Sequence, residues 1–191
     1  MRREHLALLA AVALLPLAAC GQKKADADGP AASSAKISSG TLAGEIGNAA
    51  GMSTVAGALK GTGLAGILDG SAPYTLLAPD DDAFGALGEA GAALKAPENS
   101  AAMAEVLKSH ILPGYLTVAD IDAAIKKAQG KPVKMTTMDG AEVTFARKGE
   151  DLTVTAADGS TAKVDGKELA ASNGVAIPLD AVLKKVPKSG A

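Results

Sequence analysis

The sequence predicts an α+β fold, in which a helical half and a sheet half form one domain. Apolar residues recur at helical spacing in several segments before residue 126, whereas residues 133 to 164 alternate with a period of two. Between two of the helical segments, the stretch from Tyr74 to Phe84 is typical of a strand that leads directly into a helix. We expect this junction to lie where the two halves meet.

The bulk composition is that of one globular domain with appendages. The chain has 191 residues, of which 48% are hydrophobic and 21% charged, and its net charge is −2. A single cysteine excludes an internal disulfide. Nucleic acid is not an expected partner, because phosphate binding needs clustered basic side chains and base stacking needs more aromatic rings than this chain has.

Residues 1–19 are typical of a secretory signal peptide. Arg2 and Arg3 precede an apolar run from Leu6 to Leu15. This run is too short to span a bilayer, which requires about 20 apolar residues. We therefore expect the chain to be exported and this leader to be removed.

The end of the leader, Leu17-Ala-Ala-Cys20, resembles the bacterial lipobox. The resemblance implies lipidation of Cys20, which would hold the protein on a membrane without crossing it. Because Gly21 rather than aspartate follows, it also implies the outer membrane, on its periplasmic or surface side. The alternative is an incidental cysteine beside an ordinary cleavage site. Residues 20–40 are polar and rich in small residues, so we expect a flexible tether with a reach of roughly 25 Å.

Two helical patterns precede the junction. The first contains Leu42 and Ile46, and Ser53 or Thr54 is expected to cap the start of the second. Glycines interrupt the second pattern, so two short helices are expected there rather than one long one. The apolar positions of this second pattern are Val55, Leu59, Leu64, Ile67 and Leu68.

Three aspartates, at positions 80 to 82, follow Pro79 at the junction. We interpret them as the start of a helix, with one of them as its N-cap and all of them favourably placed in the helix dipole. A calcium or magnesium site is the alternative. The alternating oxygen ligands and the glycine of an EF-hand loop are absent, and adjacent helical residues face different ways.

Two further helices are expected in the middle of the chain. Met103, Val106, Leu107, His110 and Ile111 have the spacing of an amphipathic helix that runs to Pro113-Gly114. A second helix is expected to begin at the capping-box-like Thr117-Val-Ala-Asp120 and to end near Lys126 and Lys127. Its apolar face comprises Val118, Ile121 and Ile125.

The sheet half is predicted from alternation and turn signals. Asp139-Gly140, Asp158-Gly159 and Asp165-Gly166 separate short alternating segments, which predicts successive hairpins. A last apolar run from Val175 to Val182 closes the domain. Pro178 cannot donate a hydrogen bond to a neighbouring strand, so we expect this strand to lie at an edge or to be bulged there.

Three ordered motifs resemble those of the fasciclin domain family. They are Tyr74 to Phe84, Leu107 to Ile121, and Ala171 to Leu183. The resemblance implies one domain over residues 41–187, followed by a tail at 188–191, with a β-sandwich-like pair of sheets flanked by a layer of short helices. It also implies adhesion or extracellular binding, with no enzymatic activity and no cofactor. The candidate motif residues, expected to be structural, are Tyr74, Pro79, Asp80, Phe84, His110, Pro113, Gly114, Asn173 and Gly174.

The chain departs from the family pattern in two motifs. Ser109 stands where a tyrosine usually precedes His110, and Ile177 and Pro178 replace the histidine and valine of the last motif. The first change weakens an adhesion role carried over from animal members. The second affects the pairing of the last strand.

One histidine, His110, remains after cleavage of the leader. A metal site built on several histidines is therefore excluded, and a serine–histidine–acid triad would have to use His110. Ser109 is not expected to be its partner, because neighbouring residues on a helix do not face each other. His110 is instead expected to be a hydrogen-bonded core residue.

Three functions are therefore considered. The first is a membrane-anchored envelope lipoprotein whose domain binds an envelope or extracellular protein or a glycan. The second is a carrier of a small apolar ligand, held in a groove between helices and sheet. The third is a hydrolase that uses His110.

Overall fold

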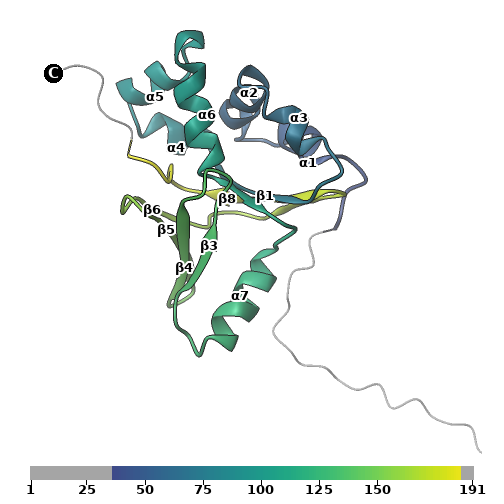
Figure 1. The fold of residues 1–191 in the computed structure, drawn as a ribbon, viewed down its shortest axis with the longest axis vertical. Helices are drawn as coiled ribbons and strands as arrows, with labels where there is room; N and C mark the ends of the chain where they lie inside the picture. The colour runs from purple at the N-terminus through teal and green to yellow at the C-terminus, as the bar shows by residue number, and fades with distance from the viewer. Residues whose placement is uncertain (1–35, 186–191) are drawn as a thin grey trace, which may run out of the picture. The chain divides into compact units, whose positions relative to one another are not determined.

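In the computed structural model, which describes residues 36–185, a layer of helices packs on one face of a first sheet, and a second sheet packs on its other face (Figure 1). In chain order the helices are α1 (Leu42–Asn48), α2 (Ser53–Gly61), α3 (Ala65–Leu68), α4 (Asp81–Gly85), α5 (Glu89–Leu94), the 3-10 helix η1 (Pro97–Asn99), α6 (Ser100–Lys108) and α7 (Val118–Lys127). The strands are β1 (Tyr74–Pro79), β2 (Ile111–Pro113), β3 (Val133–Thr136), β4 (Glu142–Lys148), β5 (Asp151–Ala156), β6 (Thr161–Lys163), β7 (Leu169–Ala171) and β8 (Gly174–Leu179). The predicted fold class is confirmed.

The first sheet has the strand order β2-β1-β8-β7. Its central strands β1 and β8 run parallel, with Tyr74 opposite Gly174 and Pro79 opposite Leu179. The two outer strands, β2 and β7, pair antiparallel with their neighbours. Segments about a hundred residues apart in sequence therefore form the middle of this sheet.

The second sheet is an antiparallel meander in the order β3-β4-β5-β6. Two of its hairpins turn at predicted Asp-Gly pairs, where Gly140 and Gly159 both have φ of 83°, and the hairpin between β4 and β5 turns at Gly149, with φ of 65°. That backbone conformation favours glycine over residues with a Cβ atom. The predicted hairpins at Asp139-Gly140 and Asp158-Gly159 are thus confirmed, whereas Asp165-Gly166 leads from β6 to β7 of the other sheet and forms no hairpin.

Two apolar cores lie on opposite faces of the first sheet. On one face, Leu76 and Ala176 pack with residues of the helices α1 to α6. On the other face, Leu77 and Ile177 pack with Phe145 of the second sheet and with residues of α7. The first sheet is therefore the middle layer of the domain. Each large side chain buried in these cores contributes about 1.5–3 kcal/mol to the stability of the fold.

Helix α7 begins and ends as the sequence predicts. The Asp120 N–H donates to Thr117 Oγ1 at 3.1 Å, and the Thr117 N–H donates to Asp120 Oδ2 at 2.9 Å, which completes a capping box. Glu168, from the loop before β7, also accepts from the Val118 N–H at 2.7 Å. The loop is thereby tied to the first turn of the helix.

Helix α6 is shorter than the sequence predicts. It ends at Lys108, and Ile111 lies in β2 rather than on the apolar face of a helix that continues to Pro113. Ile111 pairs with Leu76 of β1. Pairing with β1 therefore overrides the helical spacing, and the predicted extension of the helix to Pro113-Gly114 is wrong.

Strand β8 lies in the interior of its sheet, so the expected edge position is also wrong. Strand β7 pairs only with the first half of β8, as far as Ala176, and Pro178 lies beyond it. The Pro178 carbonyl accepts from the Asp165 N–H at 3.0 Å, so it points away from β1. In a strand the N–H and the carbonyl of one residue point to the same side, so the N–H that proline lacks would not have bonded to β1. The parallel pairing with β1 is thereby kept.

The predicted leader and Cys20 lie outside the described residues. Among the described residues at the end of the predicted tether, the Ser38 N–H donates to the Ala170 carbonyl of β7 at 2.8 Å. The Ser172 N–H donates to the Gly40 carbonyl at 2.9 Å. Within residues 36–185, no helix has the length and apolar character required to cross a membrane.

Candidate binding groove

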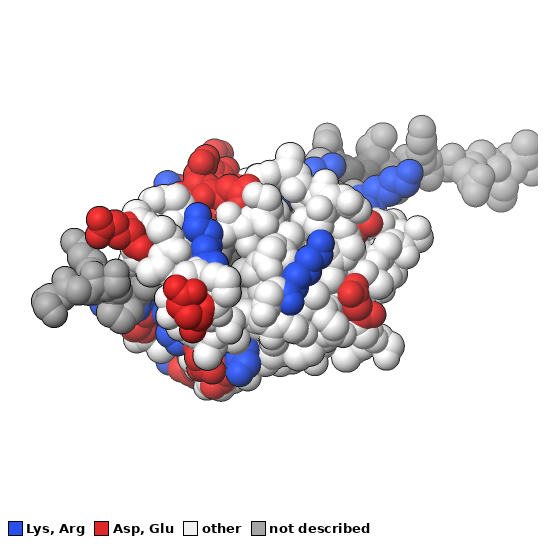
Figure 2. All heavy atoms as spheres, turned by 90° about the horizontal axis from the view of Figure 1, so that it is seen from above, with Lys and Arg blue, Asp and Glu red and all other residues white. Residues whose placement is uncertain are grey.

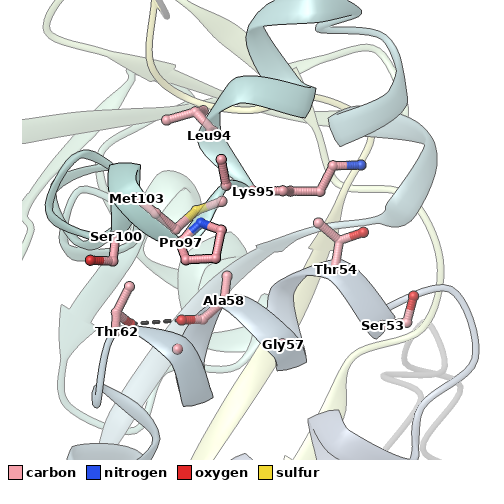
Figure 3. A pocket seen from close by; sticks show the side chains of 12 residues that line it. Ser53, Thr54, Gly57, Ala58, Thr62, Leu94, Lys95, Pro97, Ser100 and Met103 are labelled. Atoms are coloured by element: carbon pink, nitrogen blue, oxygen red, sulfur yellow. Dashed lines mark hydrogen bonds between the residues drawn. The ribbon is translucent and has the colours of Figure 1, made fainter.

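A groove of about 460 Å³ lies within the helical layer, between α2 and the segment from the end of α5 to α6 (Figure 3). It is open to solvent, and the surrounding helical surface is largely uncharged, with isolated acidic and basic groups (Figure 2). The residues that line it are Ser53, Thr54, Gly57, Ala58, Gly61, Thr62, Leu94, Lys95, Ala96, Pro97, Ser100 and Met103.

Helix α2 keeps the groove open because its lining residues are small. No atom lies within 4 Å of the position that a Cβ would take at Gly57 or at Gly61. Glycine in a helix costs roughly 0.5–1 kcal/mol relative to alanine, so neither glycine is there to favour the helix. A larger side chain at either position would occupy open space that these glycines line in the groove.

The opposite wall is apolar with a polar margin. Leu94 and Met103 are buried behind it, at 7% and 3% exposure, and Pro97 lies between them in sequence. Lys95 is the one charged residue among those that line the groove. The groove therefore suits a partner that presents an apolar surface with a neutral or anionic group beside it.

Hydroxyl groups at the groove differ in whether they are already bonded. Thr62 donates to the Ala58 carbonyl at 2.7 Å, and Ser53 donates to Asp81 at 2.8 Å. Within the described part of the chain, the Ser100 side chain makes no hydrogen bond, whereas the Thr54 side chain bonds to the Asp81 carboxylate and helps to lower its pKa. The Ser100 hydroxyl can therefore donate to or accept from a bound group.

Asp81, the second of the three aspartates, fixes the start of α2. Its carboxylate accepts from the backbone N–H groups of Ser53 at 3.2 Å and Thr54 at 2.7 Å. The predicted capping by Ser53 or Thr54 is therefore wrong, since neither side chain caps the helix and the residue at the N-cap position is Met52. The cap comes from α4, which ties the groove to the junction after β1.

Asp80 caps its own helix, as expected for one of the three aspartates. Its Oδ1 accepts from the Ala83 N–H at 2.7 Å. Pro79 is the last residue of β1, and Phe84 is 1% exposed in the core under the helices. Across residues 36–185, no three His, Cys, Asp or Glu side chains come together as a metal site would need.

His110 is fully buried at the junction of α6 and β2. Nδ1 lies 2.7 Å from the Val106 carbonyl, and Nε2 lies 2.9 Å from the Leu183 nitrogen. Because the carbonyl can only accept and the Leu183 N–H can only donate, Nδ1 carries the proton and Nε2 accepts. Burial is the main cause that lowers the pKa of His110 to about 4, while the hydrogen bond to Val106 opposes the shift.

Ser109 is a neighbour of His110 after all. Its Oγ lies 3.3 Å from His110 Nδ1, because both side chains turn back to the same Val106 carbonyl. The hydroxyl also donates to the Val106 carbonyl at 2.7 Å. Both nitrogens of His110 are engaged and the ring has no exposed surface, so this pair offers no base that a substrate could reach.

The remaining motif residues lie around the start of β1 and β8. Asn173 Oδ1 accepts from the Leu42 N–H at 2.8 Å, and its Nδ2 donates to the carbonyls of Leu68 and Gly70 at 2.8 and 2.6 Å. A Cβ at Gly174 would lie 2.4 Å from the Tyr74 carbonyl oxygen. These residues hold backbone segments together and do not line the groove.

The loop after β2 is fixed in the same way. The Gly114 N–H donates to the Pro73 carbonyl at 2.9 Å, and the Thr75 hydroxyl donates to the Gly114 carbonyl at 2.8 Å. Gly114 has φ of 104°, and Pro113 before it is exposed. The structure therefore brings the motif residues together as supports of the first sheet, and the groove contains none of them.

The architecture and the open groove define a small α+β binding domain. The model of the Fasciclin domain matches residues 50–185, and the chain belongs to this family. The chain is also 32% identical over 133 residues to Protein sll1483 of a Synechocystis strain, a match that covers 69% of this chain and 66% of the relative.

A solved FAS1 domain pair from the insect cell adhesion molecule Fasciclin I has the same fold. The TM-score is 0.67 at 15% identity, over 78% of this chain and 52% of that one. The chain thus spans about half the length of the solved structure and 66% of the curated relative. Domains of this family are typically adhesion modules outside the cytoplasm, which makes this chain a binding module in the general sense.

Proposed function

We propose that the protein is a lipid-anchored lipoprotein of the bacterial envelope whose fasciclin domain mediates adhesion, binding an envelope or extracellular protein or a glycan through the groove. The groove itself carries the proposal. Pro97, the unbonded Ser100 hydroxyl and Lys95 are available to a partner, and no core contact requires Gly57 or Gly61 to be open. The domain needs no cofactor for this role, and catalysis is not part of it.

The groove can be filled without disturbing the core. Gly57→Leu and Gly61→Leu together add bulk where no atom lies within 4 Å, and leucine favours the helix more than glycine does. Gly66→Leu in α3 is the matched control, since its Cβ position is equally open and it does not line the groove.

The experiment is affinity capture from cross-linked envelope fractions, together with a glycan array. The wild-type chain and the Gly66→Leu control should bind the same partner, and the filled variant should lose it. A partner that is held equally by all three chains would show that binding lies elsewhere. Capture of no partner and of no glycan would remove the adhesion proposal.

Anchoring is tested separately. The lipobox-like segment predicts that Cys20→Ala releases the protein from membranes, because a leader without the cysteine can receive no thioether-linked lipid. The measurement is the distribution of the protein between membrane and soluble fractions. A variant that stays in the membrane fraction with its mass unchanged from wild type would contradict lipidation at Cys20.

A small apolar ligand is the second candidate for the groove, favoured by its wall of Leu94, Pro97 and Met103. The groove differs from the expected one, because it lies within the helical layer rather than between helices and sheet. Solvent extraction of the purified protein followed by mass spectrometry should then yield a bound lipid or pigment. Recovery of the wild-type protein without any ligand counts against a carrier.

A further inference from the structure

The end of α7 and the segment after it concentrate lysines far from the groove. Residues 123 to 138 include Lys126, Lys127, Lys131 and Lys134 and contain no aspartate or glutamate, in a chain whose net charge is −2. All four side chains are exposed. We call these four residues the lysine cluster.

The lysine cluster occupies one end of the domain. Hydrogen bonds from the Gly130 N–H to the Ile125 carbonyl at 2.9 Å, and from the Lys131 N–H to the Ala128 carbonyl at 3.1 Å, fold the turn back onto the end of α7. In Figure 1 this end of α7 and the turn into β3 lie on the side of the molecule opposite α2 and α6. The lysine cluster and the groove therefore lie at opposite ends of the domain.

Among the described residues, one lysine of the cluster is paired with a carboxylate. Lys134 pairs with Glu142 at 2.9 Å, a contact between two well exposed side chains. Among residues 36–185, no carboxylate lies within ion-pair distance of the other three lysines. The nearby Asp122 is held by Arg147, with Arg147 Nε to Asp122 Oδ1 at 2.7 Å.

The helix dipole explains only part of this pattern. Lys126 and Lys127 lie in the last turn of α7, where a positive charge is favourable. Lys131 and Lys134 follow the helix and gain nothing from its dipole. Like charges gathered on a surface raise the local potential and attract a polyanion.

We propose that the lysine cluster binds the anionic headgroups of the membrane that carries the protein. The inference rests on the proposed anchoring, which keeps the domain within roughly 25 Å of the lipid surface through the tether. Each lysine close to an anionic membrane strengthens binding about fivefold. Nucleic acid fits less well, because no described aromatic side chain is exposed for stacking on bases.

Vesicle binding by residues 21–191 tests the proposal without the anchor. This chain lacks Cys20 and keeps every residue of the described domain, so lipidation cannot contribute. It should cosediment with phosphatidylcholine vesicles that contain phosphatidylglycerol, should not cosediment with phosphatidylcholine alone, and should be released by salt. The variant Lys126→Gln, Lys127→Gln, Lys131→Gln should bind roughly a hundredfold more weakly.

The matched control changes three exposed lysines elsewhere: Lys60→Gln, Lys167→Gln and Lys185→Gln. It has the same net charge as the cluster variant and should bind within about threefold of wild type. Urea unfolding should show both variants to be folded, the cluster variant slightly less stable because it loses two cations from the last turn of α7. Equal losses in both variants, equal binding to both vesicle types, or stronger binding to duplex DNA than to vesicles would overturn the proposal. Membrane release of Cys20→Ala is measured in a separate experiment. If the anchoring proposal is wrong, Cys20→Ala stays in the membrane fraction, and if the lysine-cluster proposal is wrong, residues 21–191 do not bind the anionic vesicles selectively.

Discussion

The Asp81 carboxylate accepts a 2.7 Å hydrogen bond from the backbone N–H of Thr54, a residue 27 positions earlier in the chain. The contact joins the first turn of α2 to the helix that follows β1. It therefore couples the shape of the groove to the sheet beneath it.

Asp81→Ala should destabilise the domain by about 1–2 kcal/mol, because two N–H groups at the start of α2 lose their acceptor. Urea unfolding followed by circular dichroism measures the loss. Asp82→Ala is the control, since Asp82 is exposed and makes no side-chain hydrogen bond to another described residue. Equal effects of the two changes would show that the cap contributes nothing.

Acid should weaken the same contact. Burial alone would raise the pKa of Asp81, but the hydrogen bonds from Thr54 and Ser53 together outweigh it and hold the pKa below 3.8. A group with a lowered pKa in the folded state contributes stability that is complete above its unfolded pKa and is lost as the pH falls through the folded one. The stability difference between wild type and Asp81→Asn should therefore shrink below about pH 4.

His110 predicts a second pH dependence at higher pH. Its pKa is about 4 in the fold, against 6.5 for an ordinary histidine, so the unfolded chain binds the proton more tightly between these values. Stability should fall by roughly 3 kcal/mol as the pH drops from about 6.5 to about 4, and this contribution should then level off. His110→Gln should be less stable at pH 7.5 and should lack this slope. Parallel pH profiles of the two proteins would contradict the buried neutral histidine.

Gly174→Ala should be strongly destabilising, by about 2 kcal/mol or more. Its Cβ would lie 2.4 Å from the Tyr74 carbonyl oxygen and 2.8 Å from Leu42 Cδ2, so β1 and β8 would have to separate. Gly66→Ala meets no atom within 4 Å and should be neutral or slightly stabilising. Thermal unfolding distinguishes the two, and similar melting temperatures would show that the sheet accommodates the methyl group.

Asn173 should tolerate neither of two substitutions. Asn173→Ala removes the acceptor for Leu42 and both donors, which predicts a loss of about 3 kcal/mol at roughly 1 kcal/mol per hydrogen bond. Asn173→Asp keeps the acceptor but turns a carboxylate oxygen toward the Leu68 and Gly70 carbonyls. It should therefore be no more stable than the alanine variant at neutral pH, and a near-native Asn173→Asp would rule out the donor role.

Local signals predicted the local structure well. The Asp-Gly turns and the Thr117–Asp120 box act within a few residues, so sequence alone defines them. The same reasoning failed at Ile111, where the helical spacing continues but pairing with Leu76 of β1 decides the structure. It failed again at Pro178, because the short length of β7 cannot be read from the residues around it.

The candidate groove was not predicted. Helix α5 and η1 lie in an alanine-rich stretch with little apolar periodicity, and the cap from Asp81 joins residues too far apart for any local pattern. The one available signal was Gly57 and Gly61, four residues apart and therefore on one face of a helix, with Gly61 interpreted only as an interruption. Net charge also concealed the lysine cluster, because acidic residues elsewhere in the chain cancel it.

The parallel pairing of β1 with β8 also sets the order in which the domain can be completed. Tyr74–Pro79 has no partner on that side until Gly174–Leu179 has been synthesised, so β8, one of the two central strands of the first sheet, is the last strand to be made. Long-range pairings of this kind slow folding, because the chain between the two strands must lose conformational entropy before their contacts can form. An emerging chain therefore lacks the paired centre of its first sheet through most of translation, an unfolded state that suits the export we propose.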